Sequence, residues 1–278
     1  MNNKLLQTMA IIMMLVGYGL VSGPFISDQY SRIGQTASIV SYEKTMEAIK
    51  DDGYTQIQQA CDIYNQKIAE KQQEEYYHYD DTTNFSDDYL SWPVSGSDIG
   101  TLYIPDLNIT LPIGHGTSDE TLQVKAGHLY GTSLPCGGES THAVISGHSG
   151  LRTAEMFDNL SDLKIGDKAY IKISNRVLEY TVREINIVLP QEHDQYMQIE
   201  QGKDLLTLYT CTPYGINSHR LLVKCEHTDT EIIEAEKQME MINIKVDSLK
   251  PKIIIGSMIV IPVAIAGVAL YFVWKKED

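Results

Sequence analysis

Residues 205–223 read LLTLYTCTPYGINSHRLLV, in which two short apolar runs flank a polar loop. Each run has the length and composition of a β-strand, and the loop contains Pro, Gly and Asn, which are typical of turns. If the two strands form an antiparallel hairpin, Arg220 at the start of the second returns to the side of Cys211 at the end of the first. The stretch therefore predicts a β-hairpin that carries a cysteine and an arginine next to each other.

The same texture extends over residues 99–227, which we expect to form one mainly β domain. Short apolar runs, several with alternating apolar residues, are separated by Gly, Pro, Asn and Asp. Beyond the hairpin, they cover residues 102–104, 107–111, 143–145, 169–173 and 178–189. Many short strands at this spacing are typical of a closed or nearly closed β-barrel.

Two stretches without charge lie near the ends of the chain, Leu5–Ser27 and Ile253–Trp274. Each is about long enough to cross a bilayer, which takes roughly 20 residues. Lys4 and Lys275–Lys276 lie at their outer ends and mark those ends as cytoplasmic, so the middle of the chain is expected outside the cell. The predicted segments are an N-terminal anchor at 1–27, a transmembrane helix at 253–274 and a cytoplasmic tail at 275–278. A cleaved signal peptide is the alternative for the first segment.

Residues 28–75 are expected to be helical. Apolar residues repeat in steps of three and four from Ile39 to Ile49 and again from Ile57 to Ile68, which is the spacing of an amphipathic helix. Gly53 is expected to break or kink the helix between the two sets. Residues 228–252 are predicted to form an acidic helical spacer before the second membrane segment.

Residues 76–98 form a predicted lid and linker between the helical region and the β domain. They open with acidic and aromatic residues that follow neither a helical nor a strand period. One interpretation is a solvated linker. The other is a mobile flap, because aromatic side chains are costly to leave in water and favour docking onto a surface.

Cys211 is the candidate nucleophile of the chain. A fixed guanidinium from Arg220 beside it would favour a thiolate and would offer donors to an oxyanion. A nucleophilic cysteine also needs a proton carrier for its leaving group. His148 is the candidate for that role, since it follows a predicted strand in the permissive turn Gly-His-Ser-Gly at 147–150.

The composition excludes several classes of protein. The formal net charge is −15, which argues against a nucleic-acid partner because such proteins need a basic face. Four cysteines in 278 residues do not make a disulfide scaffold. Cys61, Cys136 and Cys225 are expected to pack or stay free, with a Cys136–Cys225 disulfide as the alternative. No CxxC, HExxH or histidine run indicates a metal site.

The two strands of the predicted hairpin resemble the active-site strands of the sortases. The resemblance rests on TLYTC at 207–211 and NSHR at 217–220. AGHLYGTSLP at 126–135, AVISGH at 143–148 and CTPY at 211–214 resemble the class C, pilus-building branch, and the two-anchor layout also fits it. The resemblance implies a sortase β-barrel over 99–227, flanked by the N-terminal amphipathic helices and by a transmembrane helix at each end. It also implies transpeptidation on the surface of a Gram-positive bacterium, without metal or cofactor.

Residue by residue, Cys211 matches the nucleophile, His148 the catalytic histidine and Arg220 the catalytic arginine. Thr210 matches a residue that orients substrate and oxyanion. Class C sortases commonly carry a lid with an Asp-Pro-aromatic motif. No Asp-Pro pair precedes the barrel here, and the nearest match to the lid is Asp80, Asp81 and Phe85.

Three other histidines could be confused with the catalytic one. We interpret His219, next to Arg220, as a loop-structural residue, and His128 as a packing residue. His142 lies six residues before His148 and could share its face, but two histidines without further ligands do not make a metal site.

The implied reaction is acyl transfer. The thiolate attacks the threonine carbonyl of an LPXTG-like sorting signal, and an amine of another pilin subunit then attacks the thioester. The expected partners are pilins or other surface proteins with such signals, together with the lipid bilayer. One alternative is a thiol peptidase, in which water resolves the acyl-enzyme. The other is a non-enzymatic surface scaffold built on the same barrel.

Overall fold

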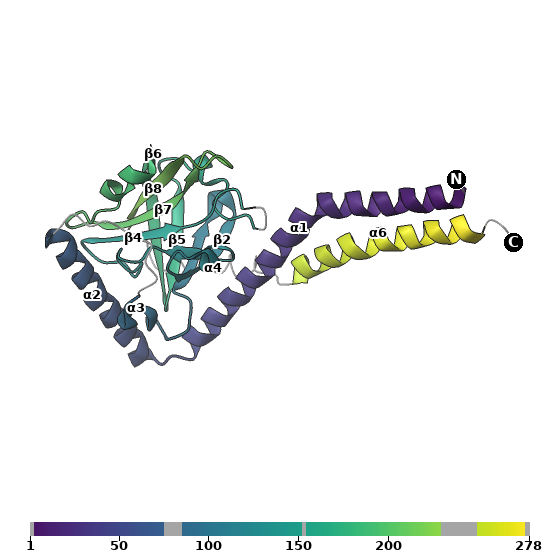
Figure 1. Ribbon diagram of the computed structural model, residues 1–278. Helices are drawn as coiled ribbons and strands as arrows, with labels where there is room; N and C mark the ends of the chain where they lie inside the picture. The colour runs from purple at the N-terminus through teal and green to yellow at the C-terminus, as the bar shows by residue number, and fades with distance from the viewer. Residues whose placement is uncertain (1–2, 75–84, 152–153, 229–248, 276–278) are drawn as a thin grey trace. The chain divides into compact units, whose positions relative to one another are not determined.

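A computed structural model describes residues 3–74, 85–151, 154–228 and 249–275 (Figure 1). The chain divides into two compact units. One consists of residues 1–34, 152–154 and 247–278, and the other of residues 35–151 and 155–246. The first unit holds the start of the long N-terminal helix together with the C-terminal helix, and the second holds a β-barrel with the helical segments that precede it.

The second unit is built on a closed barrel with the strand order β1-β2-β3-β4-β7-β8-β6-β5. The strands are β1 (Gly100–Ile104), β2 (Ile109–His115), β3 (Ala126–His128), β4 (Thr141–Ser146), β5 (Lys168–Ile173), β6 (Arg176–Val188), β7 (Asp204–Thr212) and β8 (His219–His227). β2–β3 and β4–β7 are parallel pairs, and the other neighbours are antiparallel. The predicted closed barrel is confirmed.

Short helical turns connect several strands. They are η1 (Pro105–Leu107), α4 (Asp119–Leu122), η2 (Leu160–Asp162) and η3 (Pro190–Tyr196). The turn η3 follows β6 and precedes β7. It therefore lies in the connection that leads into the strand of Cys211.

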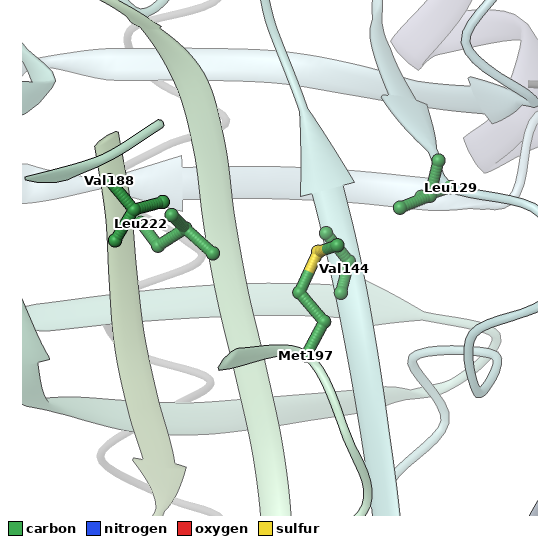
Figure 2. Close-up of a cluster of buried hydrophobic side chains, with 5 residues drawn as sticks. All are labelled: Leu129, Val144, Val188, Met197 and Leu222. Carbon is green, nitrogen blue, oxygen red and sulfur yellow. The ribbon is translucent and has the colours of Figure 1, made fainter. Parts of the chain in front are cut away.

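Strand alternation gives the sheet two apolar faces. On one face, Ile145, Leu208 and Val223 are register partners across β4, β7 and β8 and are fully buried. The residues between them point the other way, because side chains alternate along a strand. On that second face a separate buried cluster forms (Figure 2) from Leu129, Val144, Val188, Met197 and Leu222.

The second cluster supports the end of β7. Tyr209 is the register partner of Leu222 and packs against the cluster, as does Tyr196 of η3. Cys211 follows Tyr209 by two residues and so emerges on the same face. The cluster thus packs beneath the end of β7 that carries Cys211.

Among the described residues before the barrel there are three helices: α1 (Asn3–Glu47), α2 (Asp51–Glu74) and α3 (Asp87–Leu90). The predicted apolar repeats are confirmed as buried faces, which comprise Ile39, Tyr42 and Met46 of α1 and Ile57, Cys61, Tyr64 and Ile68 of α2. The end of α1 is docked on β5, where Tyr42 Oη accepts from the Ser174 N–H at 2.8 Å and Glu43 pairs with Lys172 at 2.5 Å.

The break between the helices was predicted in the wrong place. It lies between Glu47 and Asp51, and Gly53 belongs to the first turn of α2. A Cβ on Gly53 would come within 2.5 Å of Ile49 Cγ2. The glycine therefore allows the chain to fold back tightly before it, and it does not itself end the helix.

The expectation for Cys61 and Cys136 was also wrong. The two form a disulfide that joins α2 to the segment between β3 and β4, with their Cα atoms 6.6 Å apart. Cys225, the alternative partner of Cys136, is a buried free thiol in β8. The buried face of α2 carries Cys61 onto Cys136, so the pairing depends on how a helix docks on the barrel.

Asn65 holds the same junction one helical turn after Cys61. Its side-chain oxygen accepts from the Leu134 N–H at 2.7 Å, and its amide nitrogen donates to the Leu134 carbonyl at 3.1 Å. The disulfide and this amide pair both connect α2 to the segment before Cys136.

The first unit contains the start of α1 and α6 (Leu249–Lys275). Both helices are long and apolar enough to cross a membrane, and an 18-residue window in each has a mean hydropathy of 1.9 and 2.3, respectively. They run antiparallel, because Tyr18 Oη donates to the Met258 carbonyl at 3.0 Å while Lys4 lies 5.7 Å from the ring centroid of Trp274. The predicted spans lie within these two helices.

The expected boundary at Ser27 does not coincide with a helix end, since α1 continues through Pro24 to Glu47. The predicted acidic spacer at 228–252 lies almost entirely outside the described residues.

Candidate active site

The β7–β8 hairpin brings Cys211 and Arg220 together as register partners. Its loop is closed by N–H groups of Ile216 and Asn217, which donate to the Pro213 carbonyl at 3.0 and 2.9 Å. Asn217 has φ +58°, a left-handed conformation that Asn adopts more readily than most residues. The predicted hairpin geometry is confirmed.

His148 stands at the corresponding end of β4. Because β4 and β7 are parallel and Ser146 pairs with Tyr209, the ends of the two strands lie at the same edge of the sheet. The Gly147 N–H donates to the Tyr209 carbonyl at 3.1 Å, and Thr210 Oγ1 donates to the Gly147 carbonyl at 2.7 Å. The residue before His148 is thus fixed to the two residues before Cys211.

Gly147 is required by close packing. A Cβ at this position would lie 2.8 Å from the ring of Phe157. The backbone of Phe157 also donates to the His148 carbonyl at 3.0 Å. Together these contacts hold the His148 turn between β4 and the segment that follows it.

The three predicted site residues are reachable from solvent. Cys211 is a free thiol and is partly exposed, and His148 and Arg220 are partly exposed as well. Thr210 is different, because it is buried and its hydroxyl proton is used in the bond to Gly147. In this structure Thr210 holds the His148 turn in place.

Arg220 is held by three hydrogen bonds. Its Nε donates to Tyr209 Oη at 3.0 Å, and its Nη1 donates to the carbonyls of Asn217 and His219, both at 3.1 Å. Within the described part of the chain, no hydrogen bond engages Nη2. The guanidinium is therefore fixed on two sides and open on the third, as an oxyanion donor needs to be.

Tyr209 and His193 contact Arg220 or its partners but were not among the predicted site residues. His193 Nδ1 lies 2.7 Å from Tyr209 Oη, and His193 Nε2 lies 3.0 Å from Asp194 Oδ1. Tyr209 could have been found by alternation, since it lies two residues before Cys211. His193 comes from η3, and no sequence pattern connects it to the hairpin.

His128 and His142 are enclosed structural residues. Burial lowers the pKa of each to about 4. Both ring nitrogens of His142 have partners at 2.8 Å, the Gln198 carbonyl and Thr207 Oγ1. His142 therefore does not share the exposed edge of His148, whereas His128 packs as predicted.

His219 is a loop residue that pairs with its neighbour, with Nδ1 2.9 Å from Ser218 Oγ. Its carbonyl is one of the Arg220 acceptors. Among the described residues, no three His, Cys, Asp or Glu side chains are grouped so that they could hold a metal ion.

The predicted lid is described only at its end. Asp80 and Asp81 lie outside the described residues. Phe85 packs against Tyr89 and Tyr130 with ring centroids 5.4 and 5.1 Å apart, and its ring presses on Gly116. Tyr89 Oη in turn accepts from the Gly116 N–H at 2.9 Å. The segment thus joins the barrel through an aromatic cluster beside β2 and β3.

Comparison with known proteins shows which family this barrel resembles. A profile of the sortase domain matches residues 102–228. The solved structure of sortase C1 from group B Streptococcus (GBS) pilus island 1 is 36% identical with a TM-score of 0.65, and the match covers 70% of this chain and 98% of that one. The chain belongs to the sortase family. Sortases are cysteine transpeptidases, and this sortase is assigned to that enzyme class.

Other relatives agree with the assignment. A sortase C from Streptococcus pneumoniae is 34% identical with a TM-score of 0.62, covering 69% of this sortase and 96% of that chain. A sortase A from Streptococcus agalactiae is 37% identical over 117 residues, which are 41% of this chain and 47% of the relative. The match thus spans about half of that relative. A sortase A from Bacillus anthracis is 24% identical over 79% of this chain and 93% of its own length.

Proposed function

We propose that this sortase is a class C transpeptidase that joins pilin subunits through an LPXTG-like sorting signal. The observation that carries the proposal is the pairing of Cys211 with Arg220, with His148 fixed at the adjacent strand end. The similarity to sortases C supports the substrate class. One of those structures is described as pilus-related, and the description of another refers to pilin substrate specificity.

In the proposed first half-reaction, the Cys211 thiolate attacks the carbonyl carbon of the threonine in the sorting signal. The C=O electron pair moves to oxygen, and the open edge of the Arg220 guanidinium donates to that oxyanion. The C–N bond then breaks, and protonated His148 gives its proton to the leaving amine. The product of this half is a thioester on Cys211.

In the second half-reaction, an amine of another pilin attacks the thioester carbon. His148 takes the proton from the attacking nitrogen, and the C–S bond breaks to restore the thiolate. A new amide joins the two subunits. Water in place of the amine would make the enzyme a thiol peptidase, so the acceptor decides the outcome.

We propose that the barrel faces the outside of the cell, with both termini in the cytoplasm. The two apolar helices and their lysines support this topology. The Cys61–Cys136 disulfide supports it independently, because disulfides persist outside the reducing cytoplasm. Protease added to intact protoplasts should destroy a barrel epitope and spare a tag after Asp278. Loss of the tag would contradict the two-span topology.

The segment from Tyr76 to Phe85 is proposed as a lid. Phe85 supports this role because its aromatic cluster attaches the segment to the barrel, while Asp80 and Asp81 are the residues proposed to face Arg220. Replacing residues 76–84 by a Gly/Ser segment of equal length should raise both Cys211 alkylation and peptide cleavage. If neither rate changes, the segment is only a tether.

The activity is tested with the full-length protein in detergent and a fluorescent LPXTG-like peptide, with and without an added amine. We expect a ligated product that depends on the amine and on Cys211. Cys225→Ala is the matched control, since it also removes a thiol but from a buried site in β8. Hydrolysis at the same rate, with no ligated product at any amine concentration, would contradict transpeptidation.

A further inference from the structure

A chain of polar groups lies behind the Arg220 guanidinium, on the side away from its open edge. Arg220 Nε is 3.0 Å from Tyr209 Oη, Tyr209 Oη is 2.7 Å from His193 Nδ1, and His193 Nε2 is 3.0 Å from Asp194 Oδ1. The four residues come from β8, β7 and η3. They connect the hairpin to the β6–β7 connection at the level of the site.

The hydrogen-bond inventory fixes the direction of the bond at the Arg220 end of the chain. Arg220 Nε has one hydrogen and can only donate, so Tyr209 Oη accepts it. The tyrosine proton is then available to His193 Nδ1, which accepts it in the tautomer that carries the imidazole proton on Nε2. In that tautomer Nε2 lies beside the Asp194 carboxylate, which makes a 3.0 Å charge contact with it and, among the described residues, no hydrogen bond through Oδ1. Tyr209 thus both accepts and donates, and hydrogen bonds linked in this way polarise one another.

The surroundings favour these protonation states. Burial raises the pKa of Tyr209 to about 12, so its hydroxyl stays protonated. Burial and the nearby Arg220 charge lower the pKa of His193, while Asp194 acts in the opposite direction. A neutral imidazole at neutral pH is the form that accepts the tyrosine proton.

We infer that Tyr209 is a positioning residue that, backed by His193, sets the plane of the Arg220 guanidinium for oxyanion binding. The inference rests on the proposed role of Arg220. Two carbonyls hold Nη1 alone, and a guanidinium held at a single nitrogen can still tilt. The Nε bond to Tyr209 adds the second fixed point, so the direction of Nη2 is determined.

Tyr209→Phe removes only the hydroxyl and keeps the ring that packs on the buried cluster. In the full-length enzyme we expect kcat for the sorting peptide to fall about tenfold with KM within about twofold, because the oxyanion exists only in the transition state. Tyr196→Phe is the matched control. Tyr196 packs on the same cluster, and its variant should stay within about twofold of the parent.

A double-mutant cycle separates positioning from general stability. If Tyr209 acts through Arg220, then Tyr209→Phe should cost little in an Arg220→Lys background, measured as single-turnover acylation. An equal loss in both backgrounds, an unchanged kcat, or a change confined to KM would overturn the inference. A fully active Arg220→Lys parent would instead contradict the proposed role of Arg220, so the two failures are distinguishable.

His193 gives a second test. His193→Gln keeps an acceptor for the tyrosine proton and should retain kcat within about twofold, whereas His193→Ala should lower it by roughly threefold, because water replaces the acceptor imperfectly. Thermal melting of each variant checks the fold. If Gln and Ala variants are equally impaired, or both fully active, His193 does not support Tyr209.

Discussion

The cysteines of this sortase lie in opposite surroundings. Cys61 and Cys136 are buried and joined where a helix meets the barrel, whereas Cys211 is free and partly exposed where a strand ends beside Arg220. The first pair fixes two elements to each other, and the last is open to a substrate. A cysteine therefore stabilises the fold at one place and is suited to catalysis at another, and the surrounding residues determine which role it has.

The largest effect should come from Cys211→Ala. The variant should lose activity by about a thousandfold or more, because no other group at the hairpin end can form the thioester. The free energy of unfolding should change little, since one small side chain at a partly exposed strand end contributes little to the core. Peptide ligation and a urea melt measure the two. Activity near that of the parent would contradict the assignment of the nucleophile.

Arg220→Lys should follow, with an activity loss of about a hundredfold. Lysine keeps the charge but cannot donate to Tyr209, to the loop carbonyls and to an oxyanion from one planar group. Steady-state kinetics with the sorting peptide measures the loss. Nearly full activity would mean that Arg220 acts only as a charge.

Removing the disulfide should lower stability and leave activity unchanged, which is the reverse of the effect expected for Cys211→Ala. Replacing Cys61 and Cys136 together by Ala should lower the free energy of unfolding by about 2–5 kcal/mol, because the crosslink closes a loop across 75 residues. Activity at low temperature should be kept. The control is Asp52→Asn at the exposed start of α2. Equal stability of the parent and the double variant would show that Asn65 and packing alone hold the helix.

The smallest expected effect is a difference in alkylation between the two free cysteines, Cys211 and Cys225. Burial raises the pKa of Cys225 to about 12, so at pH 8 the thiol stays protonated, and it is also enclosed. Iodoacetamide should modify Cys211 and leave Cys225 unmodified in the native protein. Peptide mapping measures this, and urea should expose both. Native labelling of Cys225 would contradict its enclosure in β8.

Much of the barrel and of the site could be predicted from local sequence. Alternation along 205–223 and a turn-rich loop were enough to place Cys211 beside Arg220, because a hairpin brings neighbouring parts of the chain together. The Cys61–Cys136 bond could not be predicted in this way. The periodicity of α2 indicated a buried face for Cys61, but which barrel residue it meets depends on docking between distant segments.

The residues that support Arg220 could likewise be predicted only in part. Tyr209 was within reach of the alternation that placed Cys211, whereas His193 enters through the β6–β7 connection, which carries no repeating pattern. The prediction for Gly53 is wrong for a related reason: a glycine between two helical repeats favours a helix break, but in the structure it allows a close approach to Ile49. The roles of His193 and Gly53 depend on side-chain contacts with other segments, and local sequence patterns do not predict such contacts.

The central claim is that Cys211 carries the acyl group between two peptides. The most direct measurement is an acid quench of the full-length enzyme with a sorting peptide and no amine, followed by peptide mapping by mass spectrometry. We predict one adduct with the mass of the cleaved sorting peptide, located on Cys211 and released by hydroxylamine as a thioester is. An adduct on another residue, or ligation that proceeds without any adduct on Cys211, would contradict the account.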